Sequence, residues 1–158
     1  MALRDQPYLP LYVQDYLTDE KLNMCSLSSQ GVYIKIICLF HKSDTYGGIL
    51  LKQKDKQNSS TTLNFALKIA KLLPIPLQDI NDAIGELLDE KVLTIDGDFM
   101  FQKRMVKDNE ISIKRADSGK KGGIKSQSKN KPNKDQNASN FETKKNEAKH
   151  EYENEYEN

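Results

Sequence analysis

The amino-acid sequence predicts a mainly helical α+β domain followed by a polar, charged tail. Before Ile113, apolar residues recur with helical spacing in several stretches. The pair Asp96-Gly97 stands between two short apolar runs, as in a β-hairpin. After Ile124 the sequence consists mostly of Lys, Asn, Ser, Gln and Glu. A chain of 158 residues has room for one such domain with a tail.

The first elements are a lead-in and a helix. Residues 8–27 are aromatic and irregular, and Pro7 and Pro10 oppose a helix start, so we expect an extended conformation here. Ser28 is then expected to act as the N-cap of a helix over 29–42. One face of this helix would carry the apolar residues Val32, Tyr33, Ile36, Ile37 and Phe40.

The next elements are a strand, two helices and a hairpin. After a turn over 44–48, the apolar run "ILLK" predicts a strand. The segment "TTLNFALKIAKLL" has helical periodicity, and Pro74 is expected to end it. The hairpin strands "VLTI" and "FMFQK" flank Asp96-Gly97. Before them, a third helix is predicted by the spacing of Ile80, Ala83, Ile84, Leu87 and Leu88.

The order helix, strand, helix, helix, hairpin is that of a winged helix, so we predict a winged-helix domain over residues 1–104. An exit helix is expected over 105–118, and a disordered basic-then-acidic tail over 119–158. Residues 114–134 carry eight cations and one anion, or 8 − 1 = +7. Residues 147–158 carry one lysine and five glutamates, or 1 − 5 = −4. Opposite charge blocks of this kind are typical of interaction tails.

The stretch "GKKGGIKSQSKNK", 119–131, comes within one residue of a phosphate-binding P-loop. Ile124 stands where the second glycine belongs, and its Cβ would obstruct the phosphates. The residues before it form a polar helical pattern, whereas a P-loop follows a buried strand. We therefore interpret this stretch as a flexible basic linker.

Metal and catalytic sites are not expected. Cys25, Cys38 and His41 lie near one another, but a structural zinc site needs four ligands and no second pair exists. Cys38 lies in an apolar run and is expected to be a buried thiol. His41 and His150 fall in no nucleophile or acid–base motif. The sequence thus predicts a protein that is not an enzyme, with no catalytic residue, metal or cofactor.

Nucleic-acid binding is the chemistry that remains. The third helix carries acidic residues that repel phosphate. If the domain itself contacts DNA, we expect it to use cationic surfaces elsewhere: Lys52, Lys54 and Lys56, then Lys68 and Lys71, and then Lys103, Arg104 and Lys107. We expect sequence-independent contacts with the DNA backbone. The predicted DNA-binding residues are Lys103, Arg104, Lys114, Arg115, Lys120, Lys121, Lys125, Lys129, Lys131 and Lys134.

Two alternatives stay open. The first is a protein-interaction adaptor that docks on a basic partner through the acidic residues of the third helix, Asp79, Asp82, Glu86 and Asp89. The second is a phage transcriptional regulator, which would need a symmetric dimer and a face that reads bases. The oligomeric state stays open, and oligomerisation is compatible with each alternative.

Three segments resemble the YdaU-like group of phage and prophage proteins: "MCSLSSQGVYIKIICLFHKSDTYGGIL", "LLDEKVLTIDGDFMFQKRMVKDNE" and "KRADSGKKGG". In that group a winged-helix-like domain precedes an Arg-Met-x-x-Asp segment and a Gly-Lys-Lys-Gly-Gly stretch, which match Arg104, Met105 and Asp108 and residues 119–123. The resemblance implies a role in phage replication, close to replisome organisers and initiators. Its implied partners are DNA and the host replicative helicase or its loader.

No apolar run approaches the roughly 20 residues that span a bilayer, so no membrane association is expected. The two cysteines stand in a sequence without export features, which favours reduced thiols. We therefore expect a cytoplasmic protein.

Overall fold

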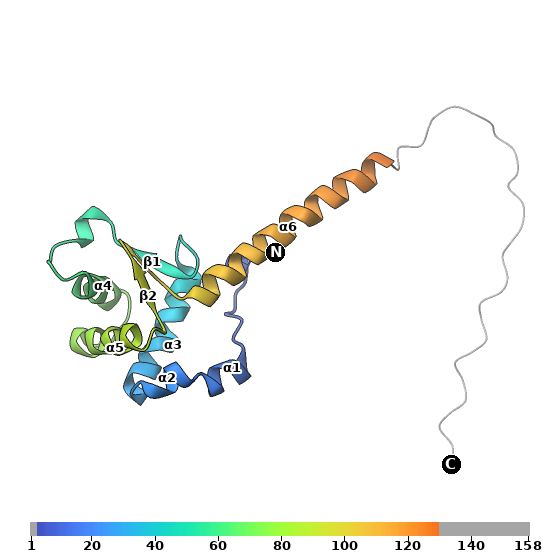
Figure 1. Cartoon of the computed structure of the whole chain (residues 1–158). Helices are drawn as coiled ribbons and strands as arrows, with labels where there is room; N and C mark the ends of the chain where they lie inside the picture. Colours follow the sequence, from blue (N-terminus) through green and yellow to red (C-terminus); the bar gives the residue numbers. More distant parts are fainter. Residues whose placement is uncertain (1–2, 130–158) are drawn as a thin grey trace, which may run out of the picture.

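The structure, a computed structural model, describes residues 3–129, with the side chains of Arg4 and 125–129 left aside. It is a mainly helical α+β structure with a small antiparallel sheet. Helices and sheet form a body from which one long helix, α6 (Lys103–Lys129), projects (Figure 1).

The core of the body lies among α3 (Leu27–Lys42), α4 (Thr61–Ala70) and α5 (Leu77–Asp89). Their apolar faces meet because residues three and four apart share one side of a helix. The largest fully buried side chains are Leu22, Ile36, Phe40, Phe65, Ile69, Ile80, Ile84, Leu87, Leu93 and Met100.

The ends of α3 and α4 differ from the prediction. Ser26, not Ser28, caps α3, because its Oγ accepts a hydrogen bond of 3.2 Å from the backbone N–H of Ser29. Helix α4 ends at Ala70, before the predicted stop at Pro74. The prediction that Cys38 is buried is wrong: Cys38 is exposed, and Cys25 is the buried thiol.

The sheet has the order β1-β3-β2, from β1 (Gly48–Leu50), β2 (Thr94–Asp96) and β3 (Phe99–Phe101). Both pairings are antiparallel, which confirms the predicted strand and hairpin. Gly97 adopts φ +57° in the hairpin turn. A Cβ on Gly48 would lie 2.5 Å from the carbonyl oxygen of Met100, so this strand needs glycine at its first position.

The predicted extended lead-in is wrong over much of its length. After η1 (Leu3–Asp5), the chain forms α1 (Val13–Thr18) and α2 (Glu20–Met24). The Asp19 side chain caps α2 by accepting from the backbone N–H groups of Lys21 and Leu22. Both prolines precede α1, where they do not interrupt a helix.

His41 fastens the N-terminal segment to the body. The carbonyl oxygen of Gln6 can only accept, so Nε2 of the buried His41 donates to it over 2.9 Å. In the neutral ring, Nδ1 then accepts from the Tyr46 hydroxyl, 3.0 Å away. The imidazole therefore has a structural partner on each side.

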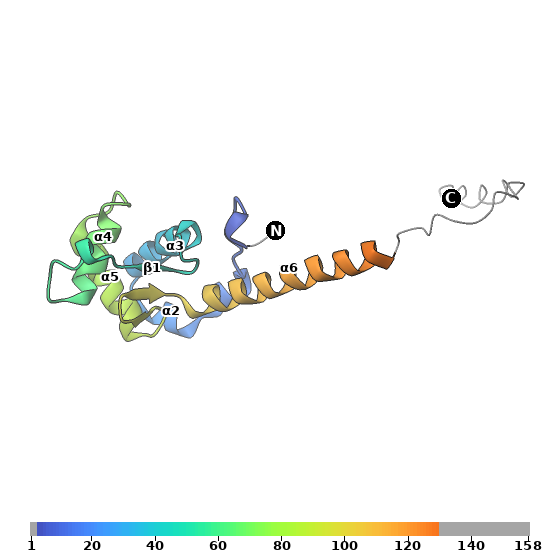
Figure 2. The ribbon, with the colours of Figure 1, turned by 90° about the horizontal axis from the view of Figure 1, so that it is seen from above.

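Helix α6 extends beyond the predicted end at Ser118. The expectation that disorder begins at Gly119 is wrong, because the helix continues to Lys129. Its 27 residues correspond to an axial length of about 40 Å. Figures 1 and 2 both show it leaving the body. The rest of the predicted tail, 130–158, lies outside the described residues.

Candidate nucleic-acid interface

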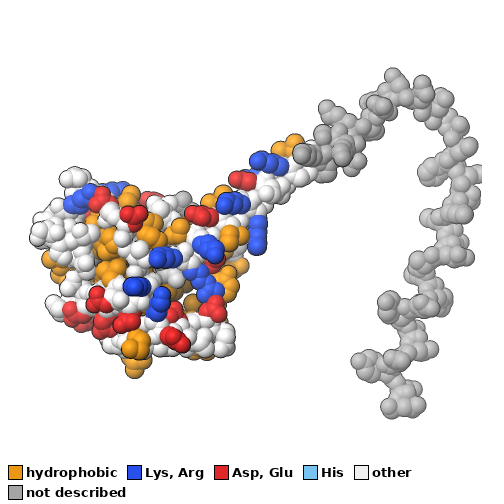
Figure 3. Space-filling view, in the orientation of Figure 1, with side chains coloured by type: hydrophobic (Ala, Val, Ile, Leu, Met, Phe, Trp, Pro, Cys, Tyr) orange, Lys and Arg blue, Asp and Glu red, His pale blue; other side chains and the backbone are white. Residues whose placement is uncertain are grey.

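The projecting helix α6 is strongly basic. It contains nine Lys and Arg residues and three Asp and Glu residues, or 9 − 3 = +6. In Figure 3, blue side chains follow the helix outward from the body. The base of the helix contacts the body through Met105 and Arg104. Farther along the helix, the side chains of Lys107, Lys114, Arg115, Lys120 and Lys121 are exposed to solvent.

The lysines of α6 are arranged in a stripe. At about 100° per residue, Lys103, Lys107, Lys114 and Lys121 fall within an arc of roughly 40° on one side of the helix. All four are exposed. From the first to the last, the stripe extends about 27 Å along the axis. We call these four residues the lysine stripe; the backbone position of Lys125 continues it.

The other predicted DNA-binding residues lie at varied positions. Arg115 and Lys120 are exposed on α6 but outside the stripe. Lys129 is the last residue of the helix. Lys131 and Lys134 lie outside the described residues. The structure thus brings part of the predicted set onto one face, together with Lys107.

Arg104, also predicted to contact DNA, is held within the molecule. Its Nη2 lies 2.6 Å from Oδ2 of Asp15, and its guanidinium lies 3.6 Å from the centroid of the Tyr12 ring. Its Nε lies 3.9 Å from Oδ2 of Asp108. The contacts with Tyr12 and Asp15 join the start of α1 to the base of α6, so Arg104 acts first as a structural link.

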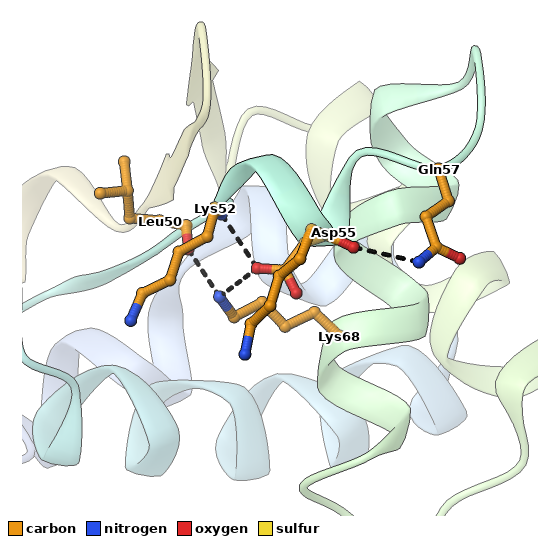
Figure 4. A network of polar contacts seen from close by, with 6 residues as sticks. Leu50, Lys52, Asp55, Gln57 and Lys68 are labelled. Atoms are coloured by element: carbon orange, nitrogen blue, oxygen red, sulfur yellow. Dashed lines mark hydrogen bonds and ion pairs between the residues drawn. The ribbon is translucent and has the colours of Figure 1, made fainter.

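Some lysines of the body are also engaged. Lys68 Nζ donates over 2.7 Å both to the carbonyl oxygen of Leu50 and to Oδ2 of Asp55, as Figure 4 shows. The hydrogen bond from Lys68 is the main reason why the pKa of Asp55 lies below its usual range. Lys56 pairs with Asp98. The Lys52 side chain instead extends away from Asp55, which its backbone N–H contacts over 2.9 Å.

The acidic residues predicted as an alternative interaction site lie on α5, where Figure 3 shows a group of red side chains. Asp79, Asp82 and Asp89 are exposed. Glu86 is different, because its Oε2 accepts from the backbone N–H of Ser26 over 2.7 Å. This bond is the main cause of a lowered Glu86 pKa. Glu86 therefore supports the start of α3, and three of the four acids form the exposed set.

Across residues 3–129, no group of three or more His, Cys, Asp and Glu is placed to hold a metal ion. Among these same residues, no helix is both long and apolar enough to cross a bilayer.

The arrangement of the lysine stripe was missed by sequence reasoning, which placed its outer part in a disordered segment. The signal was present as lysine spacings of four, seven and seven residues, which are helical repeats. The contacts of Arg104 with Asp15 and of Glu86 with Ser26 had no comparable local signal, since these partners lie far apart in sequence.

Comparisons with known proteins add no relative. No protein-family model matches the sequence, and neither a curated protein nor a solved structure matches it. The resemblance to the YdaU-like group therefore stays a prediction from the sequence.

Proposed function

We propose that this chain is a non-enzymatic DNA-associated protein that contacts the phosphate backbone through α6. The observation that carries the proposal is the lysine stripe on a projecting helix of net charge +6. Each lysine that neutralises a phosphate releases counterions, which makes binding strong at low salt and weak at high salt. Contacts of this type position a protein on DNA without reading its sequence.

The order of elements in the body supports the proposal of a DNA-associated protein, because it matches that of a winged helix. The elements α3, β1, α4, α5 and the β2–β3 hairpin follow the winged-helix order, and β1 pairs with β3. In helix-turn-helix folds the recognition helix, here α5, enters the major groove. Its charge of 0 − 4 = −4 opposes that placement. The DNA surface is therefore α6, and the body is held beside the duplex.

The biological setting follows from the sequence resemblance. A basic helix attached to a winged-helix body suits an accessory of phage or prophage replication, a replisome organiser or initiator component. The host replicative helicase or its loader is then the expected protein partner, and the cytoplasm the expected location.

The test compares two triple variants of the full chain. Lys107, Lys114 and Lys121→Gln removes three cations of the lysine stripe. The matched control, Lys52, Lys54 and Lys71→Gln, removes three exposed cations of the body. Binding to single-stranded and duplex DNA is titrated from 50 to 200 mM salt. For duplex DNA, the stripe variant is expected to lower the slope of log K against log salt by about 2.7, at about 0.9 per contact.

The control variant should lower that slope by much less than the stripe variant. Equal slopes and affinities for the stripe variant and the unmodified chain would rule out α6 as the DNA surface. A loss of binding in the control alone would move the interface to the body, at Lys52, Lys54 and Lys71.

A second function, the adaptor, is favoured by the exposed acids Asp79, Asp82 and Asp89 on one side of α5. Changing these three to Lys, with Glu86 kept because it supports α3, separates the two functions. An adaptor that docks on a basic partner would lose that partner. A DNA-binding protein would keep its DNA affinity or gain some, because a repulsive surface has been removed.

A further inference from the structure

Two charged parts of this chain have opposite signs and can reach each other. One is the lysine stripe of α6, and the other is the acidic segment 147–158. We propose that the stripe binds this acidic segment of its own chain, and that the segment thereby competes with DNA. The competition with DNA rests on the proposed function, whereas the contact between the stripe and the acidic segment does not.

Charge complementarity is the first argument. The acidic segment has a net charge of 1 − 5 = −4, with glutamates at every second position from 151 to 157. Helix α6 has a net charge of +6. A single exposed ion pair contributes little, but several charges in an array act together. A peptide of this composition offers the stripe the same chemistry as a phosphate backbone, at lower charge density.

Reach is the second argument. The 17 residues of 130–146 separate the end of α6 from the acidic segment. A chain of that length spans at most about 60 Å, which exceeds the roughly 40 Å length of α6. The acidic segment can therefore reach any point of the stripe from its own attachment point.

The environment of the other cations is the third argument. Arg104, Lys56 and Lys68 already pair with Asp15, Asp98 and Asp55. The lysine stripe is exposed on α6, the helix that projects from the body (Figure 1). Glu110 and Asp117 are the acids nearest to the stripe in helical angle. Among the described residues, the stripe is the surface on which four exposed lysines lie along one side of a single helix.

The expected loss of DNA affinity follows from the attachment of the acidic segment to the same chain as the stripe. Attachment to the same chain gives the segment an effective concentration near 1 mM. If its intrinsic dissociation constant for the stripe is about 0.1 mM, DNA affinity is lowered about tenfold at low salt. Added salt weakens both interactions, so this factor should shrink towards one.

The first experiment measures DNA binding by the full chain. One variant carries Glu151, Glu153, Glu155 and Glu157→Gln. Its control makes the same change of four charges elsewhere, with Asp79, Asp82 and Asp89→Asn and Glu20→Gln. We expect the first variant to bind DNA about tenfold more tightly at 50 mM salt, and the control to change affinity by much less. Equal gains in both variants would mean a general charge effect and would overturn the competition.

The second experiment needs no DNA. A carbodiimide joins a lysine amine to a glutamate carboxylate in direct contact, with loss of water, and mass spectrometry locates the bond. In the unmodified chain, we expect bonds between glutamates of 147–158 and lysines of the stripe. A mixture of isotope-labelled and unlabelled chain shows whether each bond is formed within one chain or between two.

The outcomes are distinct. Bonds within one chain to the stripe support the contact, and they do so even if no variant binds DNA, in which case the proposed function fails alone. Bonds mainly to lysines of the body, or mainly between two chains, would overturn the contact.

Discussion

Helices α5 and α6 carry opposite charges in opposite surroundings. In α5 the apolar face is buried against α3 and α4, with Ile84 0% exposed, and its acids form the outer face. In α6 the apolar residues Ile113 and Ile124 are 46% and 68% exposed, and the helix leaves the body (Figure 1). The periodic pattern of α5 thus reflects packing, whereas the periodic lysines of α6 form an exposed cationic face, which we propose contacts DNA.

The largest expected difference between the two helices is in stability. Ile84→Ala leaves a cavity in the core and should lower the free energy of unfolding by about 2–5 kcal/mol. The matched change Ile113→Ala removes a half-exposed side chain and gains helix propensity, so its effect should stay within about 0.5 kcal/mol. Urea denaturation monitored by tyrosine fluorescence measures both. A loss above 2 kcal/mol for Ile113→Ala would show that α6 is packed rather than free.

A pair of glycine substitutions should have opposite signs. Gly48→Ala places a Cβ 2.5 Å from the Met100 carbonyl oxygen and from the Phe99 ring, so we expect a loss of roughly 1–3 kcal/mol. An added Cβ on Gly122 meets no atom within 4 Å. Gly122→Ala should therefore stabilise α6 by up to about 1 kcal/mol. Thermal unfolding tests the first change, and helix content by circular dichroism tests the second.

The measurement of helix content by circular dichroism can be extended to all three glycines of α6, Gly119, Gly122 and Gly123. An added Cβ on each of them meets no atom within 4 Å. A helix segment without packing is marginal in water, so glycine lowers its population. Changing all three to Ala should raise the helix content, and it should raise DNA affinity if the lysine stripe must be helical. A rise in helix content without a gain in affinity would separate helix formation from binding.

The contact between Glu86 and Ser26 predicts a pH dependence. Because the pKa of Glu86 is lowered in the folded protein, mainly by the Ser26 N–H, this carboxylate stabilises the fold above its unfolded pKa of about 4.3. The contribution is lost as pH falls through the folded pKa. The unmodified chain should therefore exceed Glu86→Gln in stability above about pH 5, and the two should converge at lower pH.

Unfolding curves of both chains between pH 2.5 and 7 measure this difference. Asp89→Asn, the loss of an exposed carboxylate on the same helix, is the matched control. A stability difference for Glu86→Gln that stays constant down to pH 2.5 would contradict the role given to the Ser26 contact.

Local sequence patterns predicted those helices and strands that are determined by neighbouring residues in the sequence. Helix α5 was predicted from the period of its core residues, and the hairpin from Asp96-Gly97; both are confirmed. The short helices α1 and α2 were missed because α1 has no buried residue and α2 buries only Leu22, so neither shows a full apolar period. Cys38 was misplaced because its position, about 200° from Ile36, is on the outer side of α3.

The candidate site was predicted in composition but not in arrangement. Net charge drew attention to the basic region, yet the glycines at 119–123 suggested an early end of the helix. Once the helix continues, lysine spacing decides which cations share a face. The partners of Arg104 and Glu86 depend on the folded arrangement of α1, α3, α5 and α6, which no local pattern contains.

The smallest expected effect concerns Arg104, which the sequence assigned to DNA and the structure places against Asp15 and Tyr12. Both partners are largely exposed, so Arg104→Gln should cost less than about 1 kcal/mol of stability. Because its guanidinium is already paired, the same change should leave the salt slope of duplex binding nearly unchanged. Lys107→Gln, three residues further along α6 and in the stripe, should lower that slope by about 0.9. A slope lowered equally by both changes would mean that DNA displaces Asp15 and that the interface extends to the base of α6.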